Sequence, residues 1–408
     1  MRRGIWGQGL LGVVAVVLLA GGCSVDEAGL RNDGGGGAAG GGAGGGHAGA
    51  AGDGAGGGHA GAAGASATGG GAGAASVPAH FALTRGNVIP PGGASALLPD
   101  GRVFVLNGTS AQIFDPATET FTFAGNLITP RYAAAAVLAD GRVLVAGGTV
   151  VIDNHAQAIT DTEIYDFAQG AFVPGPSLIE PRGYPTATTL RDGRVLIVGG
   201  GLAPVGSTDR NLFPNTAEVL DAAGTAFTRA GNTSVSYGIH SAVLLADGRV
   251  MVAGGNDPRS VGGGQRGEVN LFDPTTNTFR ETSRITFGSG TGLVALPDGR
   301  ALVTGGYYGA EWTNGAIVWE PVNETSTSVG PMLNPRGASG GTVLADGRVM
   351  FVSTPEVFDP ATNTFSPGPE PTSGAYGAGV LLHDGRVLFT PSILQEAGPA
   401  TLFVPATP

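Results

Sequence analysis

The tripeptide Asp-Gly-Arg recurs seven times and constrains the fold more than any other feature of this sequence. Successive copies are spaced by 40, 52, 55, 51, 48 and 38 residues, and they begin at Asp100, Asp140, Asp192, Asp247, Asp298, Asp346 and Asp384. Repeats of this length indicate a chain built from similar supersecondary units. Residues 80–408 divide into seven units that average 47 residues each.

Each Asp-Gly lies between two apolar runs, as in "ADGRVLVAGG" at residues 139–148. This pattern predicts a two-residue β-hairpin turn, because such a turn needs the positive φ that Asp and Gly tolerate. A glycine pair follows the second strand in several units, and glycine there permits a bulge or close backbone approach. These pairs begin at Gly147, Gly199, Gly254 and Gly305.

A second hairpin follows in most units, as in "NLFDPTTNTFR" at 270–280 and "EVFDPATNTFS" at 356–366. An alternating strand runs into Asp-Pro, which suits a type I turn, and the next strand opens with Phe. Each unit therefore contains four short antiparallel strands, here called a to d in chain order. Seven such units predict an all-β fold, a seven-bladed β-propeller.

The last unit provides strands a, b and c but no segment for strand d. Residues 80–86, "HFALTRG", are similar to the d strands of other units, such as "TFTFAGN" at 120–126. We therefore expect residues 80–86 to pair with the last unit and to close the ring, which removes exposed strand edges.

The motif "LxDGRVxxxGG" resembles kelch repeats, and more specifically the central propeller of galactose oxidase and its bacterial relatives. That resemblance implies a copper radical site, in which Tyr184 falls on the radical tyrosine. Tyr237 and His240 are similar to the Tyr-His ligand pair of that family, but Gly238 and Ile239 separate them here. The family's thioether cysteine and C-terminal histidine have no counterpart, so we expect no copper and no other cofactor.

Residues 1–23 form an export signal, with Arg2 and Arg3 before a short apolar run. The signal ends in "LAGGC", which resembles a bacterial lipobox and implies lipid attached to Cys23. Residues 24–79 are dominated by Gly and Ala, and we expect a disordered tether because such a chain buries too little apolar surface to fold. The expected location is outside the cytoplasm on a lipid anchor, at the outer rather than the inner membrane.

The four-stranded units divide the predicted loops between two faces. The a–b and c–d turns share one face and are nearly uniform, whereas the b–c and d–a loops share the other face and vary widely. Variable loops on a rigid scaffold are the usual place for binding. The d–a loops lead into the innermost strands, so their residues are expected to ring the mouth of the central channel. The candidate ligand-binding residues are Arg131, Tyr132, Arg182, Tyr184, Tyr237, His240, Arg336 and Tyr376.

Two roles remain open for the three arginines. Around a concave mouth they suit carboxylate, phosphate or sugar ligands. Alternatively, they pair with carboxylates or backbone carbonyls and hold neighbouring units together. The arginine of each Asp-Gly-Arg is expected to brace adjacent turns and to have no binding role.

The sequence favours a non-enzymatic binding module with an envelope protein or a carbohydrate as its partner. A copper radical oxidase and a purely structural envelope protein are the alternatives. The formal net charge of −11 and the lack of basic clusters exclude a typical nucleic-acid-binding protein. We expect the propeller to be a monomer.

Overall fold

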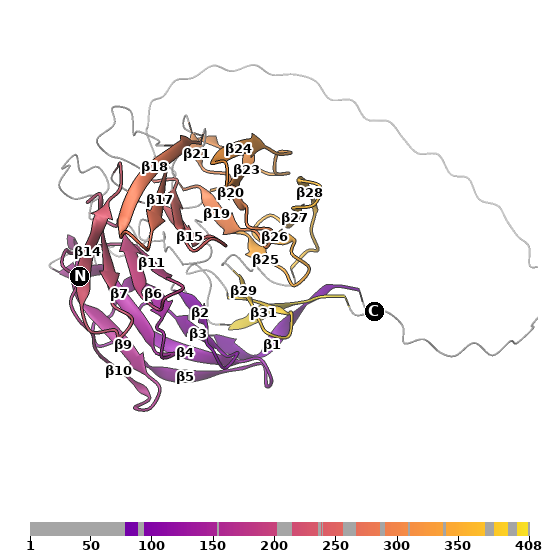
Figure 1. Cartoon of the computed structure of the whole chain (residues 1–408). Coiled ribbons are helices and arrows are strands. Elements are labelled where there is room, and N and C mark those ends of the chain that lie inside the picture. Colours follow the sequence, from indigo (N-terminus) through magenta and orange to yellow (C-terminus); the bar gives the residue numbers. More distant parts are fainter. Residues whose placement is uncertain are drawn as a thin grey trace, which may run out of the picture.

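The computed structural model describes residues 78–88, 94–152, 155–201, 214–235, 238, 240–255, 267–285, 290–308, 311–337, 340–371, 379–390 and 398–406. Every regular element within these residues is a β-strand. Seven sheets are arranged around one axis, six with four strands and one with five (Figure 1). The predicted seven-bladed β-propeller is therefore confirmed.

Blades are numbered from the N-terminal side, and each is given from its innermost to its outermost strand. Blade 1 contains β2 (Ser95–Leu97), β3 (Val103–Leu106), β4 (Ser110–Asp115) and β5 (Thr120–Asn126). Blade 2 contains β6 (Tyr132–Val137), β7 (Val143–Ile152), β9 (Thr162–Asp166) and β10 (Ala171–Pro174). Blade 3 contains β11 (Thr186–Thr189), β12 (Val195–Val198), β13 (Thr216–Leu220) and β14 (Phe227–Asn232).

The remaining blades follow the same order. Blade 4 contains β15 (Ser241–Leu244), β16 (Val250–Ala253), β17 (Glu268–Asp273) and β18 (Thr278–Arg284). Blade 5 contains β19 (Gly292–Ala295), β20 (Ala301–Thr304), β23 (Ala316–Glu320) and β24 (Thr325–Ser328). Blade 6 contains β25 (Thr342–Val343), β26 (Val349–Phe351), β27 (Glu356–Asp359) and β28 (Thr364–Pro367). Blade 7 contains β29 (Gly379–Leu381), β30 (Val387–Phe389), β31 (Gly398–Val404) and β1 (His80–Val88).

Two b–c loops contain strands of their own. In blade 2, β7 extends to Ile152 and pairs with β8 (His155–Ala158) to form an antiparallel hairpin. In blade 5, β21 (Tyr307–Tyr308) pairs with β22 (Glu311–Trp312). Val151 and Ile152, near the end of β7, are exposed.

Blade 7 joins the two ends of the propeller. His80 pairs with Val404 and Leu83 with Thr401, so β1 is the outermost strand of the sheet that also contains β29, β30 and β31. Figure 1 shows the indigo strand β1 beside the yellow strand β31. The predicted closure is confirmed, and it extends two residues beyond the expected range, to Val88.

The Asp-Gly turns differ from the expected two-residue form. The Gly101 amide donates to the Leu98 carbonyl at 2.9 Å, and the Leu98 amide donates to the Arg102 carbonyl at 2.8 Å. Only the glycine has positive φ, 88° at Gly101. This is a three-residue loop, in which an ordinary turn is followed by a left-handed glycine. Asp100 stays in ordinary backbone because its carboxylate accepts from the Arg102 amide at 3.0 Å.

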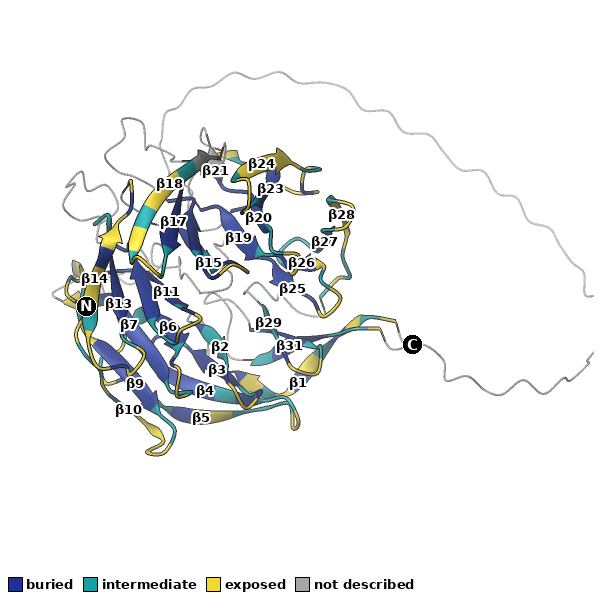
Figure 2. Cartoon of the chain, viewed as in Figure 1, coloured by how far each residue is buried: buried dark blue, intermediate teal, exposed yellow. Residues whose placement is uncertain are grey.

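The core lies between blades. Seven hydrophobic clusters of described residues each join two neighbouring sheets, including blade 7 to blade 1. Between blades 1 and 2, for example, the Phe104 ring lies 5.3 Å from that of Tyr165 and 6.2 Å from that of Phe172. Figure 2 shows the middle strands of the blades, such as β7, β17 and β20, mainly buried, with exposed residues concentrated on outer strands and turns. Every blade thus depends on both neighbours for its core.

The strand order fixes two faces. The a–b and c–d turns lie on one, hereafter the turn face, and the b–c and d–a loops lie on the other, the loop face. Strand β1 runs from the turn face toward the loop face, because it occupies the place of a d strand. The chain therefore enters the propeller at the turn face.

Candidate functional site

On the turn face, the arginines of the Asp-Gly-Arg motifs connect neighbouring blades. One guanidinium nitrogen donates to a proline carbonyl in the c–d turn of the next blade, at 2.6 to 2.8 Å. These pairs are Arg194 with Pro274, Arg249 with Pro321, Arg300 with Pro360 and Arg386 with Pro116. The predicted bracing role is confirmed for these four arginines.

The same arginines contact a residue with left-handed backbone in the neighbouring turn. Arg194 donates to the Asn277 side chain at 2.6 Å, and Arg386 donates to the Glu119 carboxylate at 2.7 Å. Asn277 has a φ of 54° and Glu119 a φ of 58°. Arg102 instead lies 5.9 Å from the centre of the Phe167 ring in blade 2. These polar side chains of the turn face therefore contact other blades of the propeller.

On the loop face, Arg182 is completely buried before β11. Its Nε donates to Glu218 Oε1 at 2.9 Å, and its Nη1 donates to the carbonyls of Gly199 at 2.8 Å and Thr216 at 2.9 Å. Nη2 donates to Thr216 Oγ1 at 2.9 Å. Both partners of the ion pair are fully shielded from solvent.

Arg131 and Arg336 repeat this arrangement before β6 and β25. Arg131 pairs with Glu163, and its Nε donates to the Gly147 carbonyl at 2.7 Å. Arg336 pairs with Glu356, and its guanidinium carbon lies 4.9 Å from the centre of a phenylalanine ring, that of Phe351. Burial lowers the pKa of Arg336 to about 10, so the side chain still carries its charge at neutral pH.

The glutamates also bind the loop backbone, a role that the sequence analysis missed. Glu163 accepts from the Ile128 amide at 2.7 Å, Glu218 from the Ile179 amide at 2.6 Å, and Glu356 from the Leu333 amide at 2.7 Å. A sequence pattern could have found these glutamates. All three stand three residues before the acidic residue of the c–d turn, as in "EIYD", "EVLD" and "EVFD".

A glycine pair holds the Arg182 loop from the neighbouring blade. The Gly148 amide donates to the Arg182 carbonyl at 2.8 Å. A Cβ atom on Gly147 would lie only 2.6 Å from the Arg182 carbonyl oxygen. The close approach expected of this pair is confirmed, and it explains why glycine is required in the middle of β7.

The three arginines therefore pair with carboxylates and backbone carbonyls, as in the second role that the sequence left open, but these partners belong to the same blade and not to a neighbouring one. Arg131, Arg182 and Arg336 are 3%, 0% and 4% exposed, so they offer little guanidinium surface to a ligand. Ligand contact by these residues stays a prediction. Cys23, Tyr237 and Tyr376 lie outside the described residues.

Tyr132 and Tyr184 occupy the same repeat position, eight residues before Asp140 and Asp192. Both side chains are half-buried on the loop face, where Tyr132 begins β6 and Tyr184 precedes β11. Burial raises the pKa of Tyr184, a hydrogen bond to Thr149 opposes the rise, and Tyr132 adds to it. The Tyr184 phenol is therefore protonated at neutral pH.

His240 precedes the innermost strand of blade 4. It is fully buried before β15, with Nε2 3.0 Å from Thr186 Oγ1 of blade 3. Burial, followed by the nearby charge of Arg182, lowers the pKa of His240 to about 3. His240 is thus a neutral bridge between blades 3 and 4.

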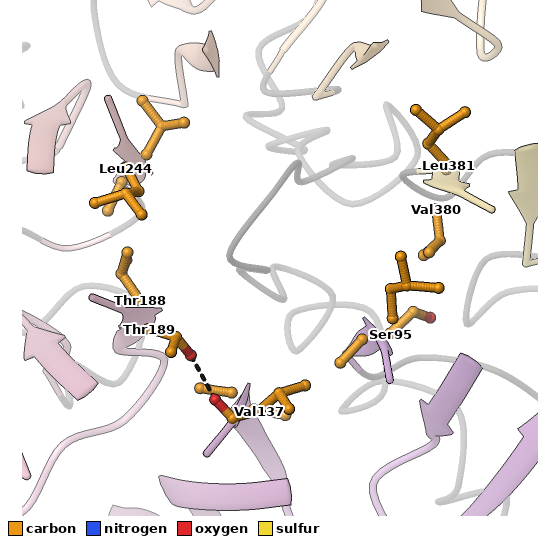
Figure 3. A pocket seen from close by; sticks show the side chains of 14 residues that line it. Ser95, Val137, Thr188, Thr189, Leu244, Val380 and Leu381 are labelled. Atoms are coloured by element: carbon orange, nitrogen blue, oxygen red, sulfur yellow. Dashed lines mark hydrogen bonds between the residues drawn. The ribbon is translucent and has the colours of Figure 1, made fainter. Parts of the chain in front are cut away.

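The central channel contains a cavity of about 450 Å³. It is lined by uncharged residues of five innermost strands, among them Ser95, Val137, Thr189, Leu244 and Leu381 (Figure 3). Thr189 donates its hydroxyl to the Val137 carbonyl at 2.7 Å, the dashed line in Figure 3. The lining residues directly precede the Asp-Gly turns, so the cavity lies in the half of the channel next to the turn face.

The described residues do not fit a copper centre of the galactose oxidase kind. Tyr184 lies half-buried before β11, whereas His240 is buried between two blades with Nε2 3.0 Å from Thr186 Oγ1. In the described part of the chain, no three His, Cys, Asp or Glu side chains gather where they could hold a metal ion.

Comparison with known proteins supports the propeller assignment. Galactose oxidase of Gibberella zeae is 26% identical over 251 residues, which cover 57% of this chain and 33% of the relative. A fungal alcohol oxidase of the AA5 family, solved in complex with copper, superposes with a TM-score of 0.59 at 18% identity, covering 81% of this chain and 76% of that chain. The fold is a galactose-oxidase-like, kelch-type β-propeller.

This galactose-oxidase-like propeller also superposes on streptogramin B lyase, with a TM-score of 0.56 and 12% identity. That alignment covers 80% of this chain and 97% of the lyase. The chain spans one third of the length of the curated relatives that it matches. No family model matches it.

Proposed function

We propose that this propeller is a binding module that recognises its partner through the loop face. One observation carries the proposal: exposed aliphatic side chains recur on the loop face, whereas the repeated arginines of the turn face make contacts between blades. Ile128, Val151, Ile152, Ile179 and Leu333 are 42% to 65% exposed and all lie in b–c or d–a segments. Exposed apolar side chains that gather on one face are typical of interaction sites.

The buried arginine–glutamate pairs support this proposal by making the loop face rigid. Each pair ties a d–a loop to strand c of its own blade, and glycine pairs tie Arg182 and Arg336 to the preceding blade. Binding loops that are already ordered lose less conformational entropy when a partner arrives.

An exported protein with a lipid on Cys23 would present this face outward. The chain enters blade 7 at the turn face through His80, on the side opposite to the loop face. Within the described residues, no helix has the length and the apolar character needed to cross a bilayer. An envelope protein or a carbohydrate is the proposed partner.

Two matched substitutions test the proposal. Val151 on the loop face and Val322 on the turn face are 65% and 85% exposed, so glutamate at either position leaves the core intact. Envelope proteins and glycans are first screened for binding to the full chain. Val151→Glu is expected to weaken binding of the partner at least tenfold, and Val322→Glu to leave it unchanged. The opposite pattern would assign binding to the turn face.

A copper radical oxidase is the second candidate, because the curated relative is a galactose oxidase. The geometry of Tyr184 and His240 argues against it. Copper titration followed by an assay for aldehyde and peroxide distinguishes the two candidates. Copper uptake with oxidation of an alcohol would contradict the binding proposal and support the oxidase.

A further inference from the structure

The residue before each Asp-Gly-Arg packs against the next blade. A Cβ added to Gly193 would lie 2.8 Å from the Ala139 Cβ, and one added to Gly385 would lie 3.4 Å from the Ala345 Cβ. Seven residues, one from each blade, make this contact with the motif glycine of the next blade and are hereafter the rim residues: Pro99, Ala139, Arg191, Ala246, Pro297, Ala345 and His383. Five of them are Pro or Ala, so the contact requires only a small apolar side chain.

The rim residues surround the turn-face mouth of the central channel. Each follows an innermost strand, and the a–b turns that contain them are three-residue loops, too short to reach across the axis. All a–b and c–d turns lie within the described residues. The cavity of about 450 Å³ lies just inside, because Thr188 and Thr189 line it and directly precede the turn that contains Arg191. No described turn therefore closes the cavity toward the turn face.

Arg191 is a rim residue whose charge is not neutralised within the described part of the propeller. It is exposed, and its Nη2 donates to the Ala246 carbonyl of the next blade. The seven motif aspartates each pair with the arginine of their own motif. Of the arginines whose side chains are described, Arg191 alone has no carboxylate within ion-pair distance. The mouth of the channel therefore holds a guanidinium that is available to an anionic ligand.

The cavity behind the rim residues has an uncharged lining. Its 14 lining residues are all Ala, Val, Leu, Gly, Ser or Thr, and Figure 3 shows Val137, Leu244 and Leu381 around the same space. The five strands that contribute them are the innermost strands of their sheets, so each has a main-chain edge that pairs with no further strand. Alternate N–H and C=O groups of such an edge point away from the sheet. The lining thus combines apolar side chains with main-chain donors and acceptors.

We propose that the turn-face mouth of the channel binds a small organic acid with one carboxylate, an amide and an apolar body, as in an N-acyl amino acid. The Arg191 guanidinium binds the carboxylate through charge-assisted hydrogen bonds. The amide pairs with the main-chain edge groups, and the apolar body contacts the side chains of the lining. A second charge on the body would lie against uncharged walls without a partner, so a monoanion is favoured. This site is separate from the loop face, and neither proposal depends on the other.

Three substitutions divide the site into its parts. Arg191→Ala removes the charge and keeps the packing, because alanine occupies this place in blades 2, 4 and 6. Ala96→Leu fills part of the cavity, since Ala96 lines it, is half-buried and belongs to none of the seven core clusters. Arg348→Ala is the control, because it removes another turn-face arginine, 48% exposed and paired with Asp346.

Isothermal titration calorimetry of the full chain with N-hexanoyl-L-leucine tests the site. We expect saturable binding that Arg191→Ala and Ala96→Leu each weaken by at least about tenfold, while Arg348→Ala leaves it unchanged. The neutral N-hexanoyl-L-leucinamide is expected to bind at least about tenfold more weakly and to be insensitive to Arg191→Ala, because it has no carboxylate. Decanoate, which has no amide, is also expected to bind more weakly. Circular dichroism establishes that each variant is folded.

Each part of the proposal has a result that would overturn it. No saturation up to about 1 mM, or equal binding of the leucinamide, would exclude the proposed carboxylate site. An equal loss in Arg348→Ala would show a general effect of charge, and binding of decanoate as tight as that of the acyl leucine would exclude the amide contact. If Arg191→Ala did not fold, Ala96→Leu and the leucinamide would still test the site. Val151→Glu is expected to leave binding of this acid unchanged; a loss there would place the acid on the loop face and overturn the inference.

Discussion

At the scale of single residues, buried charge pairs make the d–a loops rigid. Arg182 and Glu218 are both fully buried, and the carboxylate also accepts hydrogen bonds from the loop backbone at Ile179. Removing one partner of such a pair leaves an uncompensated charge in a region of low polarity. The exposed ion pairs of the turn face contribute less to the free energy of unfolding, because solvent screens their charges.

Glu218→Gln is therefore expected to lower the free energy of unfolding by about 3–5 kcal/mol, since Arg182 then keeps its charge without a counterion. Glu119, which pairs with Arg386 and has a side chain 28% exposed, provides the matched control. Glu119→Gln is expected to change the free energy by less than about 1 kcal/mol. Urea denaturation measures both variants, and equal effects would contradict the assignment of the two pairs.

His240 makes the stability of the propeller depend on pH. Its pKa is about 3 in the folded chain against an ordinary value of 6.5. Between these values the unfolded chain binds a proton that the folded chain does not, so stability falls as the pH falls. From about pH 7 to about pH 5 the expected loss is about 2 kcal/mol.

His240→Gln is expected to remove most of this pH dependence, because glutamine does not titrate. The pKa of Glu324 is lowered to about 2, mainly by its hydrogen bond with Arg280, and that shift adds a loss only below the ordinary value of 4.5. Urea unfolding at the two pH values isolates the histidine. If the free energy of unfolding of His240→Gln depended on pH as strongly as that of the unchanged chain, another group would be responsible for the effect.

At the scale of elements, the c–d turns determine whether the turn-face arginines find a partner. Arg194 and Arg386 contact the side chains of Asn277 and Glu119, which occupy the left-handed position of the next turn. In blade 3 the left-handed residue of the turn is Gly224, with a φ of 74°, which stands one residue earlier than Asn277 and Glu119 do in their turns. Glycine gives the turn its conformation but offers Arg142 no side chain.

Gly224→Asn is expected to raise the free energy of unfolding by about 0.5–1 kcal/mol. Asn tolerates the left-handed backbone, and a Cβ at this position would lie 3.5 Å from Arg142 Nη2 with no clash. Gly170 is the control, because its φ is 63° and nothing lies within 4 Å of a Cβ there. Thermal unfolding compares the two. If Gly170→Asn raised the free energy of unfolding as much as Gly224→Asn, the contact with Arg142 could not be the cause of the increase.

The sequence predicted those elements whose signals are local. Asp-Gly between apolar runs located every a–b turn, although not its three-residue form. That form depends on the aspartate carboxylate capping the Arg102 amide. The sequence analysis did not predict the hairpin of β7 and β8, although "TVVIDNHAQA" (149–158) contains a strand signal in Val150, Val151 and Ile152.

The directions of the loop-face side chains could not be predicted in the same way. Arg131 and Arg182 were correctly placed in the d–a loops, but their buried carboxylate partners lie 32 and 36 residues further along the chain. Only the packed blade brings such residues together.

At the scale of the whole molecule, the account depends on closure of the ring. Each blade shares its core with both neighbours, and the cluster that joins blade 7 to blade 1 includes Val88 of β1 together with Phe114 and Leu388. Without β1, blade 7 would lack its outermost strand and this interface would lose part of its core.

A disulfide across β1 and β31 tests the closure most directly. His80→Cys with Val404→Cys joins directly paired residues in a chain whose Cys23 is replaced by serine, so no other thiol competes. Paired residues in adjacent strands lie within the reach of a disulfide. His80→Cys with Leu402→Cys is displaced by two positions and serves as the control, because Leu402 pairs with Ala82. Mass spectrometry of the oxidised protein is predicted to show an intramolecular bond in the first variant only, with a higher melting temperature; a missing bond, or equal bonding in both variants, would contradict the closed seven-bladed ring.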